Sequence, residues 1–259
     1  MRYFLSIFLA FSISISTNAQ FLEKKEDLKS FKGFFDFHYN ENKDEIYLQV
    51  DRLNTAFLYT QFLTTGIGSN DIGLDRGQLG NTKILEFRKA GNKLLLVEPN
   101  QNYRAITTNQ AEKNSVKEAF AESVIFGFEI KETMDSTYVI DFTPFLLEDA
   151  HGVSEKLKRG KFGSYSLDKS KSALSLDRTK AFPENVEFEA LLTFSGKPTG
   201  RTVNSVVPDA SNITVKQHHS FVKLPDDNYK KRLFDPRSGA IFISYQDYAS
   251  PVYEPITKR

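Results

Sequence analysis

Short runs of alternating apolar and polar residues recur along most of the chain. Residues 45–50 (EIYLQV) show the two-residue period of a half-buried strand, and residues 57–62 (FLYTQF) form a short aromatic run. Two apolar runs at 83–88 and 93–97 are separated by Ala-Gly-Asn residues that predict a β-hairpin. Further strands are expected at 137–141, 186–194, 202–207, 213–224 and 239–245. The pattern predicts a mainly β fold, a β-rich α+β class with antiparallel sheets in a sandwich- or barrel-like arrangement.

Two helical segments interrupt this strand pattern. Residues 114–120 place Glu118 three residues after Ser115, which is the spacing of a capping box. The second segment begins with Thr143 at the N-cap and Pro144 at the first helical position. It forms one apolar stripe if residues 151–152 leave the helix unbroken. That stripe would comprise Phe145, Leu146, Val153 and Leu157.

Residues 1–19 (MRYFLSIFLAFSISISTNA) have the pattern of a cleaved secretory signal peptide. Arg2 precedes an apolar, serine-containing run, and Ala19 supplies a small residue at the expected cleavage site. The apolar run is shorter than the roughly 20 residues that a membrane-spanning helix requires. We therefore expect an exported protein with no integral membrane segment after cleavage. Because the chain also lacks cysteine, we expect a bacterial protein located in the periplasm, at the outer surface or outside the cell. Residues 20–259 would then form a single β-rich domain.

Composition narrows the chemistry of the chain. It contains no cysteine, which excludes disulfides, thiolate metal sites and a cysteine nucleophile. The 34 basic and 33 acidic residues nearly balance, so the chain as a whole lacks the positive charge that is typical of nucleic-acid binding. We expect no nucleic-acid partner.

The four histidines do not form a zinc-protease motif. Such a helix carries two histidines four residues apart with a glutamate beside the first, and no pair of histidines here has that spacing. His218 and His219 are adjacent in a predicted strand, so their side chains should point to opposite faces of the sheet. We expect one of them to be buried and the other exposed.

Two clusters remain as candidate binding or interface sites. In the glycine-rich segment 65–77, Asp71 and Asp75 offer ligands for a cation and Arg76 offers a partner for a carboxylate. An ordered turn in which an aspartate pairs with the arginine explains the same residues.

The second cluster, residues 147–152, contains Glu148, Asp149 and His151. In a helix, Glu148 and His151 would be neighbours three residues apart that share a proton or a metal ion. A helix cap or a surface ion pair explains the same residues.

Several longer stretches occur together in this chain. They are TTGIGSNDIGLDRGQ (64–78), LLEDAHGVSEKLKR (146–159), SLDRTKAFPENVEFEALLTFSG (175–196), HHSFVKLPDDNYKKRLFDPRSG (218–239) and YASPVYEPITKR (248–259). Their combination resembles the N-terminal, uncharacterised domain of large secreted zinc-dependent metalloproteases of Bacteroidetes-type bacteria.

This resemblance implies a non-catalytic accessory domain. In the family that it resembles, zinc is held by a His-Glu-x-x-His helix in a separate downstream domain, so no catalytic residue, metal ligand or cofactor is assigned to this chain. The metalloprotease catalytic domain is the expected partner, with a peptide substrate as a further possible ligand. We expect a truncated chain that helps the catalytic domain to dock, fold or receive substrate. The alternative is a stand-alone exported binding protein or metal-dependent hydrolase that uses the glycine-rich segment and His151.

Overall fold

The computed structural model describes residues 21–226, 228, 230, 232–250 and 255–258. The predicted signal peptide, residues 1–19, lies outside the described residues. Among the helices of the described part, none has the length and apolar character needed to cross a membrane.

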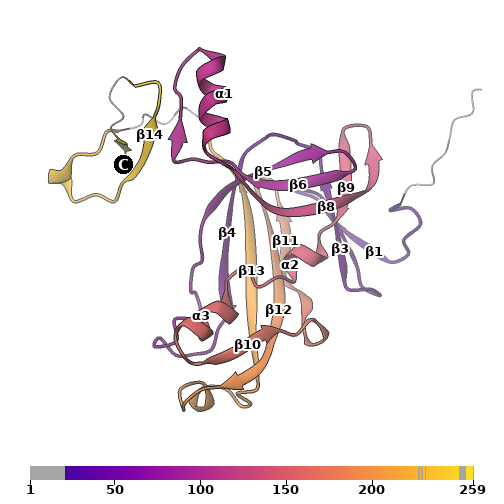
Figure 1. Cartoon of the computed structure of the whole chain (residues 1–259). Helices are drawn as coiled ribbons and strands as arrows, with labels where there is room; N and C mark the ends of the chain where they lie inside the picture. Colours follow the sequence, from indigo (N-terminus) through magenta and orange to yellow (C-terminus); the bar gives the residue numbers. More distant parts are fainter. Residues whose placement is uncertain (1–20, 227, 229, 231, 251–254, 259) are drawn as a thin grey trace, which may run out of the picture.

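Twelve strands form one large antiparallel sheet, which confirms the mainly β, antiparallel prediction. In sheet order the strands are β1 (Leu28–Phe31), β2 (Phe37–Asn40), β3 (Glu45–Val50), β9 (Thr137–Asp141), β8 (Ser123–Met134), β6 (Lys93–Glu98), β5 (Lys83–Ala90), β4 (Phe57–Thr65), β13 (Asn212–Lys223), β12 (Asn185–Pro198) and β10 (Gly163–Leu167). Strand β11 (Ala173–Phe182) pairs with the same edge of β12 as β10. The long strands β4, β13 and β12 run through the middle of the molecule, as Figure 1 shows.

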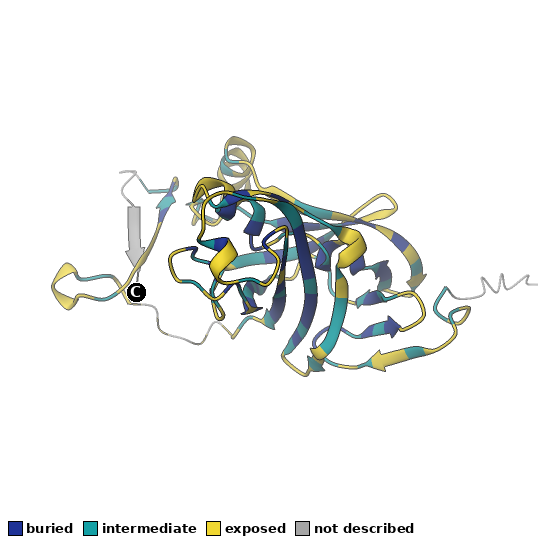
Figure 2. Cartoon of the chain, turned by 90° about the horizontal axis from the view of Figure 1, so that it is seen from below, coloured by how far each residue is buried: buried dark blue, intermediate teal, exposed yellow. Residues whose placement is uncertain are grey.

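The sheet curls but does not close into a barrel. Its two ends approach each other where the Phe34 N–H donates to the Phe182 carbonyl at 2.7 Å and the Leu174 N–H donates to the Asp44 carboxylate at 2.9 Å. The curl encloses a core rich in aromatic side chains, and Figure 2 shows the buried positions along its long strands. Burial of these large rings is the main stabilising contribution that the composition provides. The largest buried rings include Phe35, Phe57, Phe87, Phe188 and Phe221.

The helices differ from the sequence-based expectation at their ends. Helix α1 (Gln110–Ala119) begins four residues before the predicted segment, because the Asn109 side chain accepts the Ala111 N–H and caps it. The second predicted helix is two helices, α2 (Thr143–Leu146) and α3 (Val153–Arg159). Gly152 has a φ of +70° between them, a left-handed conformation that ends the helical path. The four residues of the predicted apolar stripe are nevertheless all buried.

Two of the predicted strands need correction. The range 202–207 contains a short 3-10 turn, η2 (Val203–Ser205), and strand β14 (Ile243–Asp247) begins four residues later than expected. Within the large sheet, strands β1, β2, β8, β10 and β11 were not predicted from the pattern. Most residues of β8 are exposed or partly buried. The strand therefore needs no regular alternation of apolar and polar residues, and the pattern that marks a half-buried strand is weak there.

A second, three-stranded sheet lies beside helix α1 on one side of the large sheet (Figure 1). It consists of β7 (Tyr103–Arg104), β14 and β15 (Pro255–Lys258). The buried carboxylate of Asp247 accepts the Ile106 N–H at 3.0 Å, and the rings of Tyr103 and Phe120 stack with centroids 3.8 Å apart. These contacts attach the end of the chain to the segment around α1.

Candidate functional site

The glycine-rich segment is an ordered turn that returns along β4. The Ile67 N–H donates to the Leu74 carbonyl at 2.7 Å, and the Gly77 N–H donates to the Leu63 carbonyl at 2.7 Å. Ile67, Ile72 and Leu74 are buried in a second apolar cluster that also contains residues of α3. A Cβ added at Gly66 would overlap the Leu74 carbonyl, so glycine permits this close approach. The glycine-rich segment therefore packs over this second apolar cluster.

Asp71, Asp75 and Arg76 lie on the outer side of that turn. Asp71 and Arg76 are exposed and Asp75 is partly exposed. Within the described residues, no ion pair joins either aspartate to Arg76, and none of these three side chains lines the cleft that contains Asp149 and His151. The structure therefore does not gather the two candidate clusters into one site.

Asp149 has the role of a helix cap. Its two carboxylate oxygens accept the N–H groups of Val153 and Ser154 at 2.7 and 2.9 Å. These two donors belong to the first turn of α3, where backbone N–H groups have no partner within the helix. A carboxylate at this end also interacts favourably with the helix dipole. Of the alternatives open for Asp149, the geometry supports the cap.

His151 occupies the turn between α2 and α3 and is 4% exposed. Its backbone N–H donates to Gln217 Oε1 at 2.8 Å. On the ring, Nδ1 lies 2.6 Å from Gln61 Oε1 and Nε2 lies 2.7 Å from Lys156 Nζ. Burial lowers the pKa of His151 to about 4, and the nearby Lys156 adds to this effect. The ring is therefore neutral at pH 7, and both its nitrogens are already hydrogen-bonded.

Gln217 and His219 complete this buried polar network, although neither was a candidate from the sequence. Gln217 Nε2 donates to the Glu148 carbonyl at 2.9 Å and lies 3.0 Å from His219 Nε2. His219 Nδ1 lies 2.9 Å from the Tyr59 hydroxyl. The sequence did contain a sign of their burial. In the alternating residues 213–224, Gln217 and His219 occupy the same inward face as the apolar residues. Polar side chains at such positions are buried and need partners.

His218 and His219 do point to opposite faces, but both are buried. His219 is 0% exposed and contacts the network, whereas His218 is 6% exposed, bonds to Glu187 at 2.7 Å and packs against the Phe62 ring. The expectation that one of them is exposed was wrong. The outer face of β13 is partly covered by neighbouring side chains, so alternation along this strand does not separate buried from exposed positions.

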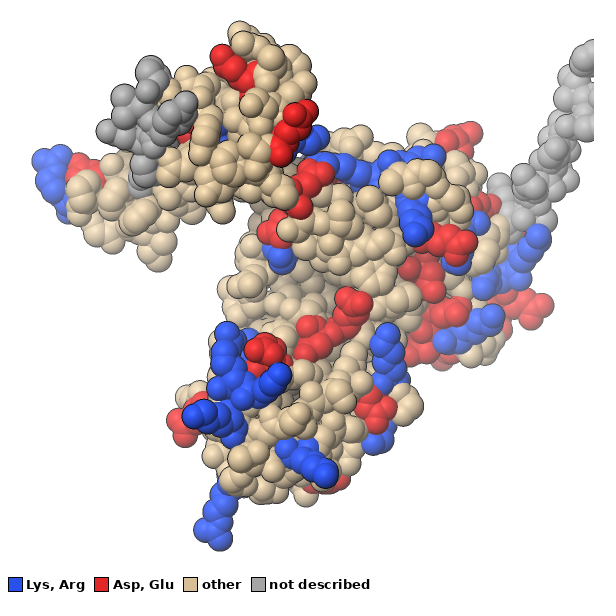
Figure 3. Space-filling view, viewed as in Figure 1, with Lys and Arg blue, Asp and Glu red and all other residues tan. Residues whose placement is uncertain are grey.

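The network forms the floor of a cleft of about 400 Å³. Figure 3 shows a hollow in this region, with acidic and basic side chains near its rim. Glu148 is exposed and Lys156 is partly buried, and partial loss of hydration raises the pKa of Glu148 and lowers the pKa of Lys156. The residues lining the cleft include Tyr59, Gln61, Ile125, Phe145, Glu148, His151, Lys156 and Arg159.

The arrangement offers hydrogen-bond donors and an apolar wall. In the part of the chain that the structure describes, no group of three or more histidine, aspartate or glutamate side chains has the geometry to hold a metal ion. The site that the fold does define is a polar-floored cleft in a curled antiparallel sheet protein. Such clefts are typical of binding sites for small groups or peptide ends.

Comparison with known protein families assigns the chain to one family. Residues 77–259 match the family described as Domain of unknown function (DUF5117), and the chain belongs to this family. The match contains Asp149, His151 and the C-terminal segment, whereas Gln61, Asp71 and Arg76 precede it. Neither the curated proteins nor the solved structures contain a match to the chain.

Proposed function

We propose that this chain is a non-catalytic accessory domain of an exported bacterial zinc metalloprotease, which docks onto the catalytic domain through an apolar C-terminal arm. The identity of the partner is supported by the resemblance of the sequence stretches described above. The mode of docking is supported by the surface of the arm, which we define as residues 232–243.

Exposed apolar side chains on the arm carry this proposal. Ile241 is 94% exposed and Ile243 is 70% exposed, and Leu233 and Phe242 are exposed as well. Soluble proteins seldom leave several large apolar side chains uncovered in one short segment, because their hydration is unfavourable. Figure 2 shows the arm as a largely exposed loop at the side of the sheet. A partner that covers this segment would gain the free energy of burying it.

The arm is held at a defined place on the molecule. It precedes β14 in the chain and shares Ile243 with that strand, which pairs in parallel with β7. The Gln246 N–H donates to the Asn102 carbonyl at 2.7 Å, and the Arg104 guanidinium lies 4.2 Å from the centroid of the Tyr245 ring. Because one end is fixed, binding a partner through the arm would require less ordering than binding through a free tail.

The first experiment concerns the partner. Sequencing the gene beyond codon 259, and its neighbours, is expected to reveal a zinc metalloprotease domain with a His-Glu-x-x-His motif. That domain, expressed separately, should bind this chain in isothermal titration calorimetry. Absence of any such domain, or absence of binding, would contradict the proposal.

The second experiment concerns the surface. The double variant Ile241→Asp/Ile243→Asp should weaken binding at least about tenfold, because it places two charges where apolar contact is expected. The matched control is Val206→Asp, which adds a charge at an exposed apolar residue directly after η2, outside the arm. Equal binding by the arm variant and the wild type would show that docking uses another surface.

The third experiment concerns catalysis. The isolated chain is expected to leave casein intact and to bind no stoichiometric zinc. Metal-dependent cleavage of casein that disappears in a His151→Ala variant would instead support the stand-alone hydrolase that the sequence left open.

A further inference from the structure

Lys156 determines where the proton lies on His151. A lysine ammonium can only donate hydrogen bonds, so His151 Nε2 must accept the 2.7 Å bond from Lys156 Nζ. The proton of the neutral ring is then on Nδ1, which donates to Gln61 Oε1 at 2.6 Å. This hydrogen bond fixes the orientation of the Gln61 amide. Its oxygen points to His151, so its NH₂ group points away from His151.

The NH₂ group of Gln61 is a donor without a partner in the described part of the chain. Gln61 is only 5% exposed, and it lines the cleft. A Cβ added at Gly80 would overlap this amide, so glycine leaves the space that the amide occupies. The amide nitrogen is not among the buried polar atoms that lack a partner, so it is open to the cleft and can donate to an acceptor bound there.

Tyr59 supplies a second donor through the Gln217 network. Gln217 Oε1 accepts the His151 N–H and its Nε2 donates to the Glu148 carbonyl, which fixes the amide orientation. Its second N–H points to His219 Nε2 at 3.0 Å, so His219 carries its proton on Nδ1 and donates to the Tyr59 hydroxyl at 2.9 Å. The hydroxyl hydrogen of Tyr59 is therefore available at the floor of the cleft.

The remaining lining residues define the shape and charge of a ligand. Lys156 keeps two hydrogens after its bond to His151, and the side chains of Ile125 and Phe145 provide an apolar wall. The charged side chains that line the cleft balance, with Lys83, Lys156 and Arg159 on one side and Glu148, Asp149 and Glu155 on the other, so a singly charged group is favoured over a doubly charged one such as phosphate. One negative charge with two acceptor oxygens and an apolar substituent matches these features.

We infer that this cleft binds a carboxylate group whose apolar substituent packs against Ile125 and Phe145. The carboxylate oxygens accept from the Lys156 ammonium, the Gln61 amide and the Tyr59 hydroxyl. Two sources share this chemistry: the carboxyl terminus of a peptide that ends in an apolar residue, and a small aryl-substituted organic acid. The site is separate from the arm of residues 232–243, so its test does not depend on docking.

Calorimetric titration of the full chain with three probes separates these sources. The probes are the tripeptide N-acetyl-Ala-Ala-Phe with a free carboxyl terminus, the same tripeptide as its amide, and 3-phenylpropionate. Binding of the peptide acid, at least about tenfold tighter than the amide, would support a peptide carboxyl terminus as ligand. Binding of 3-phenylpropionate without the peptide acid would support a small organic acid. No binding of either acid at up to about 10 mM would overturn the inference.

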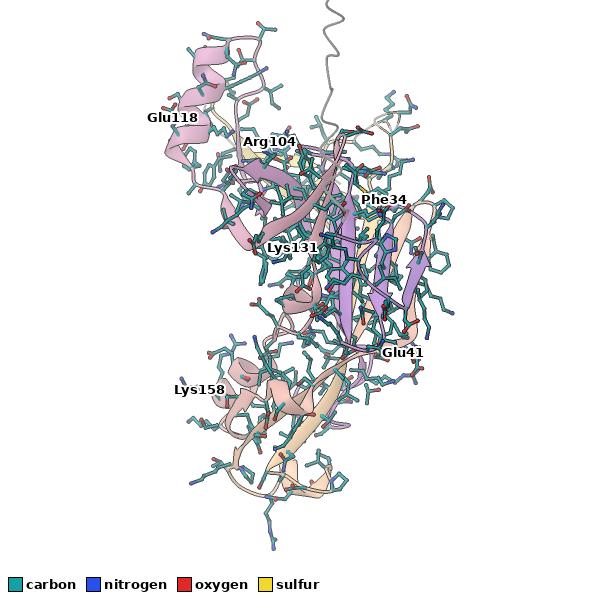
Figure 4. All side chains as sticks on the ribbon, turned by 90° about the vertical axis from the view of Figure 1, so that its right-hand side faces the viewer. Phe34, Glu41, Arg104, Glu118, Lys131 and Lys158 are labelled. Carbon is teal, nitrogen blue, oxygen red and sulfur yellow. The ribbon has the colours of Figure 1, made fainter. Side chains whose placement is uncertain are left out.

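Variants locate the binding in this cleft. Lys156→Met and Gln61→Leu should each weaken binding of the acid at least about tenfold, because each removes a cleft-lining hydrogen-bond donor to a charged group. Lys158→Met is the matched control, since it removes the same charge from the same helix at an exposed position that does not line the cleft (Figure 4). Unchanged affinity in both cleft variants would overturn the inference.

A measurement on the unaltered chain covers the case in which a variant fails to fold. In ¹⁵N nuclear magnetic resonance spectra, the side-chain NH₂ signals of Gln61 should shift on addition of the acid and stay in place on addition of the peptide amide. Signals of Gln61 that do not move while the acid binds would place the ligand elsewhere and overturn the inference.

Discussion

The backbone N–H of His151 donates a 2.8 Å hydrogen bond to the side-chain oxygen of Gln217, which lies 66 residues further along the chain. Through this bond and the bond from Gln217 to the Glu148 carbonyl, one buried side chain of β13 holds the turn between α2 and α3 against the sheet. The cleft exists because this turn is held there.

Replacing Gln217 should therefore destabilise the whole domain. Gln217→Leu leaves the His151 N–H and the Glu148 carbonyl buried without partners, and we expect the free energy of unfolding to fall by about 3 kcal/mol. Urea denaturation at pH 7 measures this loss. Gln101→Leu, at an exposed position, should change the value by less than about 0.5 kcal/mol. A small effect of Gln217→Leu would mean that the turn is held by other contacts.

The two buried network histidines make stability depend on pH. Burial lowers the pKa of His219 to about 3 and that of His151 to about 4, below the ordinary value of 6.5. Between pH 6.5 and these values the unfolded chain binds more protons than the folded chain, so acidification favours unfolding. Each histidine should lower the unfolding free energy by up to about 1.4 kcal/mol per pH unit in that window.

Urea denaturation at pH 7.0, 6.0 and 5.5 tests this dependence in a range where most carboxylates remain charged. Stability should decrease from pH 7.0 to pH 5.5, and a His219→Gln variant should show a shallower decrease than the wild type. An equally steep decrease in the variant would show that other groups cause the acid sensitivity.

The cap on α3 gives a local prediction. Asp149→Ala removes the acceptor of the Val153 and Ser154 N–H groups, and we expect a loss of about 1 to 2 kcal/mol. Asp149→Asn keeps one acceptor oxygen and should lose less. Thermal unfolding followed by circular dichroism compares the two variants. If Asp149→Ala has no effect on unfolding but alters ligand binding, the cap is not the role of this carboxylate.

The glycine-rich segment should respond to changes in its backbone rather than its charges. Asp75→Ala and Arg76→Ala should each change the unfolding free energy by less than about 0.5 kcal/mol, since no ion pair joins these two residues in the described structure. Gly66→Ala should cost about 2 kcal/mol or more, because the added Cβ meets a backbone carbonyl. A loss of several degrees in melting temperature for Arg76→Ala would restore the paired-turn interpretation.

The sequence predicted the antiparallel β class because alternation and the hairpin at residues 83–97 are local signals. It did not predict how the sheet curls, since the contact of Phe34 with Phe182 joins segments that are far apart along the chain. Asp149 and His151 were found as a cluster in the sequence. Gln61 and Gln217 were not, because glutamine carries no motif and its role here arises from tertiary hydrogen bonds.

Hydrogen–deuterium exchange of the chain, alone and with the zinc metalloprotease domain, tests docking through the arm most directly. We predict that backbone amides of residues 232–243 exchange at least about tenfold more slowly in the complex, while those of β12 and β13 are unchanged. If the chain binds the protease domain and exchange in the arm stays the same, the arm is not the docking surface.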